Sequence, residues 1–185
     1  NDAANAVALY LDGSQEAFAE RMNRRALEIG MSNTHFVTPS GLDDEAHYST
    51  AFDMALLARE ALKNSKFREL ASSGTYQIAF DNPEKKVQYT NHNKLLWLYE
   101  GCIGVKTGFT KKSGRCLVSA AERDGVTLIA VTLNAPDDWN DHAKMLDYGF
   151  ASVESVSFDE SNFSVQLPLC LLYTSPSPRD AHESR

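Results

Sequence analysis

The feature that most constrains the fold of this chain is a set of three predicted strands joined by tight turns. The strands are expected over residues 103–109, 115–121 and 126–133. Glycine, serine and aspartate occur in the connections at residues 112–114 and 124–125, and connections this short can join only antiparallel neighbours. The sequence therefore predicts a three-stranded meander. Its third run is apolar on both faces, which predicts a central strand covered on both sides.

Helical periodicity precedes and follows this meander. We expect helices over residues 2–11, 14–30, 49–61, 66–72 and 138–148, short strands over residues 75–79 and 86–90, and a turn-rich structured loop over residues 35–48. Ser14 is placed to cap the second helix, and Thr50 with Asp53 has the spacing of a capping box at the start of the third. This order predicts an α+β fold, a three-layer arrangement with helices packed on an antiparallel sheet.

Composition and charge limit the possible functions. Of the 185 residues, 43% are hydrophobic and 23% are charged, which suits one domain with a sizeable core. The net charge is −7 without a cluster of basic residues, so no nucleic acid is expected as a partner. No apolar stretch reaches the roughly 18 residues of a membrane-spanning helix. The spacing of His35, His47, His92 and His142 matches no ligand pattern, and we expect neither a metal nor a cofactor.

The cysteines are Cys102, Cys116 and Cys170, and their spacing fits no zinc-binding pattern. Cys102 and Cys116 flank the first predicted strand and turn of the meander. Two alternatives follow, a cross-strand disulfide or a pair of buried thiols, and the buried thiols are favoured.

Several blocks of sequence together resemble a known family. They are H-F-V-T-P-S-G-L-D-D at residues 35–44, Y-S-T-A-F-D-M-A at 48–55, T-N-H-N-K-L-L at 90–96, the run 101–133 with its G-V-K-T-G-F-T-K-K-S-G-R-C-L-V-S-A-A, and L-D-Y-G-F at 146–150. In this order they resemble the D-alanyl-D-alanine carboxypeptidases, the low-molecular-mass penicillin-binding proteins, from Asn1 to about Phe150. The resemblance implies a partial β-lactamase/penicillin-binding transpeptidase-like fold.

Lys106-Thr107-Gly108 is the motif of this resemblance that carries chemistry, although the triplet alone favours a strand end with a surface lysine. In the family it lies on an edge strand facing the nucleophile. The resemblance implies that Lys106 is catalytic, placing positive charge near the substrate's terminal carboxylate and supporting proton transfer, and that Thr107 donates a hydrogen bond to this carboxylate. Gly108 leaves room for a peptide along the strand, and the N–H of Phe109 donates to the developing oxyanion.

Two other motifs of the family are incomplete. Asn1 matches the last residue of S-x-N, whose asparagine orients the substrate and the lysine beside the nucleophile, so the resemblance implies a catalytic role for Asn1. The nucleophile is the serine of S-x-x-K, and no lysine in this sequence has a serine three positions before it. We expect that a preceding segment with the nucleophile and the first strands is missing, and that the chain as given is inactive.

The function implied is that of a serine carboxypeptidase that removes the terminal D-alanine from peptidoglycan stem peptides ending in D-Ala-D-Ala through an acyl-enzyme, and that β-lactam antibiotics inhibit. The location implied is extracytoplasmic, on the outer face of the bacterial cytoplasmic membrane, with membrane association only through parts absent here. A serine β-lactamase is disfavoured because no E-x-x-L-N segment occurs. A non-catalytic peptidoglycan-binding relative is the alternative from another class.

Domain boundaries are expected near residues 150 and 169. The peptidase portion covers residues 1–150, and residues 151–169 are the start of a second β-rich domain or a linker. Residues 170–180 resemble the translated mosaic-end adapter of transposase-made sequencing libraries, so residues 170–185 are interpreted as a non-native tail. A natural linker rich in proline and serine is the alternative.

A few other residues have local expectations. Trp139 is expected either to line the cleft or to pack the last helix. His92 is expected in a loop at the rim of the site. A solvated turn is favoured over a carboxylate pair for Asp43, Asp44 and Glu45.

Overall fold

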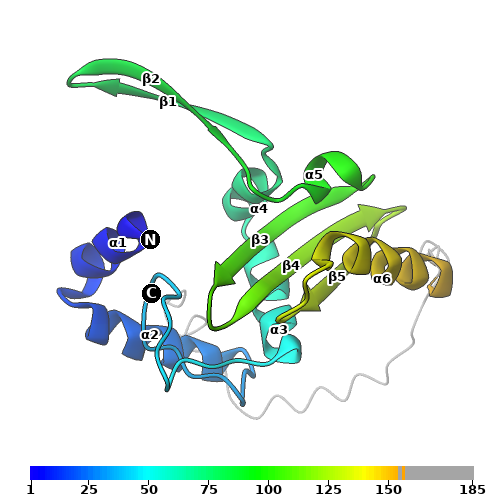
Figure 1. Cartoon of the computed structure of the whole chain (residues 1–185), viewed down its shortest axis with the longest axis horizontal. Coiled ribbons are helices and arrows are strands. Elements are labelled where there is room, and N and C mark those ends of the chain that lie inside the picture. The colour runs from blue at the N-terminus through cyan, green and yellow to red at the C-terminus, as the bar shows by residue number, and fades with distance from the viewer. Residues whose placement is uncertain (154–155, 157–185) are drawn as a thin grey trace, which may run out of the picture. The chain divides into compact units, whose positions relative to one another are not determined.

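The computed structural model describes residues 1–153 and 156. The chain divides into two compact units, Asn1–Ser155 and Val156–Arg185, and the elements described below all belong to the first. The expected non-native tail at residues 170–185, and all but residues 151–153 and 156 of the expected segment 151–169, lie outside the described residues. In chain order the elements are α1 (Asp2–Asp12), α2 (Gln15–Glu28), α3 (Ala51–Leu62), α4 (Ser65–Ser72), β1 (Thr75–Asp81), β2 (Glu84–Thr90), α5 (Leu95–Leu98), β3 (Cys102–Thr110), β4 (Gly114–Arg123), β5 (Val126–Thr132) and α6 (Asp138–Ser152) (Figure 1).

The predicted helices form, and side-chain caps set where several of them begin. Ser14 Oγ accepts from Ala17 N at 3.1 Å at the start of α2, and Thr50 Oγ1 accepts from Asp53 N at 3.1 Å at the start of α3. Each cap satisfies one of the N–H groups that the first turn of a helix leaves without an intrahelical partner. The helix α5, a single turn of four residues, was not predicted from the sequence.

The predicted capping box of α3 is only half correct. Its carboxylate, on Asp53, is buried and does not return to the backbone of Thr50. Instead, Asp53 Oδ2 accepts from Asn33 N at 2.8 Å and from Thr34 Oγ1 at 2.7 Å. A buried carboxylate takes the donors that its surroundings offer, and here the segment after α2 offers two. Asp53 therefore joins the segment directly after α2 to α3.

The meander forms as predicted, an antiparallel sheet in the order β3-β4-β5. The β4–β5 connection is the tight turn Asp124-Gly125, and both residues have positive φ, 49° and 77°. Two successive positive φ values are those of the hairpin turn that matches the twist of paired strands. The buried strand is β4, in which residues 117–121 are all buried.

The prediction of a central third strand is wrong within the described residues. β5 pairs with β4 alone and forms one edge of this sheet. Its two faces are nevertheless covered, because α3 and α6 both pack on β5 and lie on opposite sides of the sheet (Figure 1). Cover by helices on both faces accounts for the apolar composition that suggested a central position. The resulting layers, helix, sheet and helix, are the α+β arrangement expected from the sequence.

The core lies between the sheet, α5 and α6. Its buried members are Leu95, Tyr99, Leu117, Ala121, Ala130 and Leu146. Beside it, His142 of α6 is fully buried, with Nδ1 2.5 Å from Ser119 Oγ and Nε2 2.9 Å from Thr132 Oγ1. These bonds join α6 to both β4 and β5. Burial lowers the pKa of His142 to about 4 against the opposing influence of Asp138 and Asp141, so the imidazole is neutral at pH 7.

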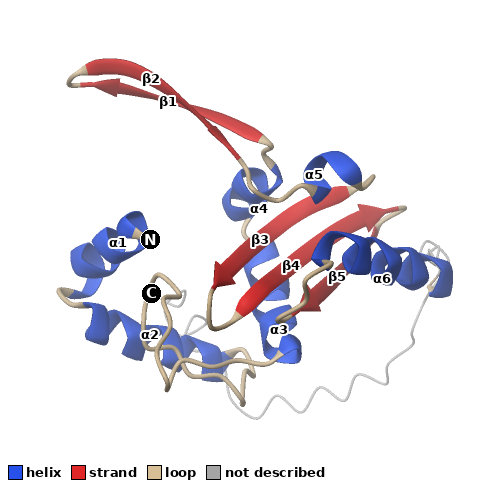
Figure 2. Cartoon of the chain, in the orientation of Figure 1, coloured by secondary structure: helices blue, strands red, loops and turns tan. Residues whose placement is uncertain are grey.

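The strands β1 and β2 form a separate antiparallel hairpin, somewhat longer than the predicted runs (Figure 2). The hairpin projects from the body of the first unit between α4 and α5 (Figure 1). All of its residues are exposed except Val87, which is half-buried.

Two further sequence expectations concern the cysteines and the membrane. Cys102 and Cys116 are free, so the favoured thiols are confirmed against a disulfide, but both side chains are half-buried rather than buried. Cys170 lies outside the described residues. Within the described part of the chain, each helix is too short or too polar to cross a bilayer.

Candidate active site

The triplet Lys106-Thr107-Gly108 lies on β3, which among the described residues pairs with β4 alone and is therefore an edge strand. It borders a cavity of about 660 Å³. The cavity is lined by Asn1, Ser40, Gly41, Leu42, His92, Lys94, Lys106, Thr107, Gly108, Phe109, Thr110, Arg115, Cys116, Asp138 and Trp139. These residues come from the start of α1, the loop at residues 35–48, the segment after β2, the β3–β4 hairpin and the start of α6.

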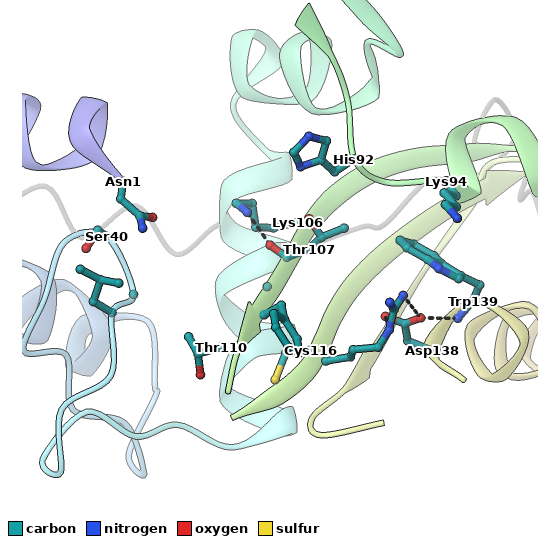
Figure 3. A pocket seen from close by; sticks show the side chains of 15 residues that line it. Asn1, Ser40, His92, Lys94, Lys106, Thr107, Thr110, Cys116, Asp138 and Trp139 are labelled. Atoms are coloured by element: carbon teal, nitrogen blue, oxygen red, sulfur yellow. Dashed lines mark hydrogen bonds and ion pairs between the residues drawn. The ribbon is translucent and has the colours of Figure 1, made fainter. Parts of the chain in front are cut away.

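Figure 3 shows two opposite sides of this cavity. Asn1 and Ser40 lie on one side, Lys94, Asp138 and Trp139 lie on the other, and Lys106 and Thr107 lie between them. A ligand in the cavity would therefore rest on β3 between the loop and the start of α6.

All five residues singled out from the sequence line the cavity: Asn1, Lys106, Thr107, Gly108 and Phe109. Lys106 Nζ donates to the carbonyl oxygen of Thr107 (Figure 3). Asn1 is the N-cap residue of α1, but its side chain makes no capping hydrogen bond. Residues separated by more than a hundred positions are thus brought to one surface, while the roles assigned to them from the sequence stay predictions.

Gly108 is not required by packing within the chain. A Cβ built there would meet only Cys116 Cβ and the Cys116 carbonyl oxygen within 4 Å, both at 3.8 Å, which is ordinary van der Waals contact. Its φ is not in the left-handed region either. The lack of a side chain therefore has no explanation in the described fold, whereas a ligand lying close along β3 would provide one.

Arg115 is a feature of the cavity that the sequence analysis missed. Its Nη2 and Nε donate to Asp138 Oδ1 and Oδ2 at 2.7 Å and 3.1 Å, and its guanidinium lies 5.5 Å from the centre of the Trp139 ring. The ion pair raises the pKa of Arg115. Asp138 is itself buried, so the pair is held in one geometry. No local pattern could have revealed a pair separated by 23 positions in the sequence.

The charge of the cavity favours an anionic ligand. Among its lining side chains, Lys94, Lys106 and Arg115 are cationic and Asp138 is the one carboxylate. Since Asp138 is taken up by Arg115, an excess of positive charge faces the cavity. A carboxylate on the ligand would complement this excess.

His92, Trp139 and Asp43 lie in or near the cavity and the loop beside it. His92 lies at the cavity, as predicted. Trp139 both lines the cavity and packs against the core, so its two alternatives are true together. Asp43 is exposed, as expected of a turn, but its carboxylate is bound by two hydroxyl groups of the β3–β4 turn region. The described residues contain no group of three histidine, cysteine or acidic side chains placed to hold a metal ion.

The fold is similar to that of two solved DD-peptidases. The crystal structure of the Streptomyces K15 DD-transpeptidase matches with a TM-score of 0.70 and 37% identity, over 73% of this chain and 54% of that one. The crystal structure of a D-alanyl-D-alanine carboxypeptidase from Mycobacterium tuberculosis H37Rv matches with a TM-score of 0.73 and 34% identity, over 81% of this chain and 59% of that one. The fold and the edge strand with its cavity thus define the class, a DD-peptidase fold with helices on an antiparallel sheet.

Sequence comparison gives the family. A family model described as D-alanyl-D-alanine carboxypeptidase matches residues 1–137. The curated D-alanyl-D-alanine carboxypeptidase DacF of Bacillus subtilis is 39% identical over 169 residues, which is 89% of this chain and 43% of that protein. DacC of Escherichia coli is 39% identical over 85% of this chain and 39% of its own length. The chain belongs to the D-alanyl-D-alanine carboxypeptidase family, and it spans less than half the length of these two relatives.

Proposed function

We propose that this chain is part of a serine carboxypeptidase that removes the terminal D-alanine from peptidoglycan stem peptides ending in D-Ala-D-Ala. The observation that carries this proposal is the position of Lys106-Thr107-Gly108 on an edge strand that borders a cationic cavity. An edge strand offers backbone groups to a peptide that adds beside it, and the cationic side chains suit a peptide with a free carboxylate.

Each residue of the triplet has a role in this proposal. The Thr107 hydroxyl donates to the terminal carboxylate, and Lys106 supplies positive charge and assists proton transfer. Gly108 lets the peptide approach β3, and the N–H of Phe109 stabilises the oxyanion of the tetrahedral intermediate. Asn1 orients the substrate as the last residue of an S-x-N motif. Family membership and the cavity support these assignments.

The chemistry requires a nucleophile that this sequence does not contain. We propose that a serine of an S-x-x-K motif, on a part of the protein not included in this sequence, attacks the peptide and forms an acyl-enzyme with loss of D-alanine. β-Lactams would acylate the same serine. It follows that the 185-residue chain by itself does not turn over substrate.

The rest of the protein follows the same reasoning. We propose that residues 1–150 are the later portion of the peptidase domain, that residues 151–169 begin a second β-rich domain or a linker, and that residues 170–185 are non-native. The substrate is a cell-wall polymer, so we place the enzyme outside the cytoplasmic membrane. Any attachment to the membrane would be made by other parts of the protein.

The test begins with the source gene, read through both ends of this sequence, and continues with its full-length product. We expect S-x-x-K upstream, Ser-Gly directly before Asn1, and covalent labelling of the product by a fluorescent penicillin. The 185-residue chain, expressed alone, is the matched control and should not be labelled. A full-length protein without the serine and without labelling would instead be a peptidoglycan-binding relative, and rapid continuous hydrolysis of the penicillin would indicate a β-lactamase.

A further inference from the structure

The loop at residues 35–48 is joined to the far end of β3 through one carboxylate. Asp43 Oδ1 accepts from Thr110 Oγ1 at 2.8 Å and from Ser113 Oγ at 3.1 Å, across 67 and 70 positions of sequence. Thr110 Oγ1 in turn accepts from Ser113 N at 2.9 Å, which fixes the turn that follows β3. Both partners of Asp43 thus belong to one structured turn, and Thr110 lies three residues after Thr107 on the strand of the candidate site.

The other hydrogen bonds that attach this loop to a helix or close its two ends lie at its base, and its remaining hydrogen bonds are internal. Asn23 of α2 bonds through its side chain to both backbone groups of Phe36, at 2.8 Å and 2.7 Å. The backbone groups of His35 and Tyr48 pair with each other at 2.9 Å and 3.0 Å. Among the described residues, only the two bonds to Asp43 connect this loop with β3 or with the turn after it.

The part of the loop between this base and Asp43 forms one side of the cavity. Ser40, Gly41 and Leu42 line it directly before Asp43 in sequence. Internal bonds shape this part, from Thr38 Oγ1 to the Leu42 carbonyl oxygen at 2.9 Å and from Gly41 N to the Thr38 carbonyl oxygen at 3.5 Å, but they do not attach it to the sheet. Its distance from Lys106 and Thr107 therefore depends on Asp43.

We infer that Asp43 is a positioning residue that sets the width of the cavity between residues 40–42 and the Lys106-Thr107-Gly108 strand. This inference rests on the proposed function, because the ligand it concerns is a peptide lying along β3. Such a peptide has β3 on one side and the loop on the other, so releasing the loop widens its site and weakens its binding. The expected effect falls on substrate affinity more than on the chemical step.

The geometry also says which property of Asp43 matters. Both hydroxyl groups donate to the same oxygen, Oδ1. Asparagine keeps a carbonyl oxygen at this position and can accept the same two bonds without the charge, whereas alanine can accept neither. Asp43→Asn should therefore preserve the connection and Asp43→Ala should remove it. Asp44 is the matched control, because its carboxylate is exposed and, among the described residues, accepts only from Ala46 N, within the loop.

The first experiment measures kcat and KM of the full-length enzyme on a peptide ending in D-Ala-D-Ala. Loss of two exposed hydrogen bonds should lower kcat/KM of Asp43→Ala by about fivefold, mainly through KM, and leave Asp43→Asn and Asp44→Ala within about twofold of the wild type. In a protein that already carries Thr110→Val and Ser113→Ala, Asp43→Ala should have almost no further effect. An unchanged kcat/KM in Asp43→Ala, or an equal loss in Asp43→Asn, would overturn the inference.

The second experiment does not depend on activity. Amide hydrogen exchange in residues 38–45 of the full-length protein should become several-fold faster in Asp43→Ala than in Asp43→Asn or the wild type, because the loop loses its connection to the sheet. If the wild-type protein neither cleaves the peptide nor reacts with penicillin, the proposed function fails, while this measurement still decides whether Asp43 holds the loop. Equal exchange in all three proteins would contradict that connection directly.

Discussion

The chain contains two antiparallel strand assemblies that differ in cover, the β1–β2 hairpin and the β3–β4–β5 sheet. Both were expected from strand-forming runs, and the register is regular in both except for a shift between Cys102 and Gly104 at the start of β3. In the hairpin every position of β1 is exposed, whereas β4 has five consecutive buried positions, residues 117–121. The sheet has helices packed on its faces, and within the described residues no helix packs extensively on the hairpin.

The difference shows what strand-forming composition does and does not determine. Tyr76, Ile78 and Phe80 alternate along β1 and share one face with Val87 and Tyr89 of β2, as register pairs Tyr76 with Tyr89 and Ile78 with Val87. This alternation would suit a buried face equally well. Burial is decided by the helices that pack on each assembly, which for the sheet include α3 before it and α6 after it in the chain. Side chains of similar character should therefore contribute very differently to stability in the two assemblies.

The largest expected contrast is between truncations of two aliphatic side chains. Leu117 of β4 is 1% exposed and packs in the core with Leu95 and Leu146, whereas Ile78 of β1 is 39% exposed. Leu117→Ala should reduce the free energy of unfolding by about 3 kcal/mol, through lost burial and the cavity left behind. Ile78→Ala should reduce it by less than about 1 kcal/mol. Urea unfolding of both variants measures the contrast, and equal losses would mean that the hairpin is as well covered as the sheet.

Much of the fold could be predicted because it is encoded by neighbouring residues. Turn residues, the caps Ser14 and Thr50, and the periodicity of apolar side chains act within a few positions, and each appears where it was expected. The place of β5 in the sheet was not predictable in this way. Strands paired on both edges and strands covered by helices on both faces have the same apolar composition, and the sequence alone cannot distinguish them.

The second contrast concerns pH, because the helix α6 that covers the sheet has a buried histidine, His142, whereas the hairpin strands contain no histidine. His142 is buried between β4, β5 and α6, and burial lowers its pKa to about 4, below the value of about 6.5 in an unfolded chain. The unfolded state therefore binds more protons between these values, so stability is complete above pH 6.5 and falls as the pH drops towards 4. The loss from this group should be roughly 2 kcal/mol between pH 7 and pH 5.

The comparison that isolates this effect is His142→Gln, which keeps a polar side chain and removes the ionisation. Burial also lowers the pKa of His47, but His47 is present in both proteins, so its contribution cancels in the difference. The difference in unfolding free energy between wild type and variant should shrink as the pH falls from 7 to 5. If it stays constant, burial does not lower the pKa of His142 below its value in the unfolded chain.

In the candidate site, as in the fold, features encoded by neighbouring residues could be predicted and features formed by distant residues could not. Lys106, Thr107, Gly108 and Phe109 are contiguous, so a motif could identify them, and Asn1 was found through a second motif. The Arg115–Asp138 pair and the bonds of Asp43 to Thr110 and Ser113 join segments that are far apart in sequence. Arginine and aspartate are common on surfaces, and only the packing of α6 and of the loop against the β3–β4 hairpin gives these residues their partners.

The smallest expected effect is that of a substitution within the β1–β2 hairpin. Lys85 is opposite Phe80 in the hairpin, and its Nζ lies 5.2 Å from the centre of the ring. At an exposed site this cation–π contact should contribute about 0.5 kcal/mol, so Lys85→Ala should speed amide exchange in β1 by about twofold. Lys86→Ala is the matched control, because Lys86 is opposite Ala79 on the other face. A change above about tenfold for Lys85→Ala would show that this face is buried against another molecule in solution. The hairpin and the sheet would then both be covered, the hairpin by a partner and the sheet by helices of its own chain.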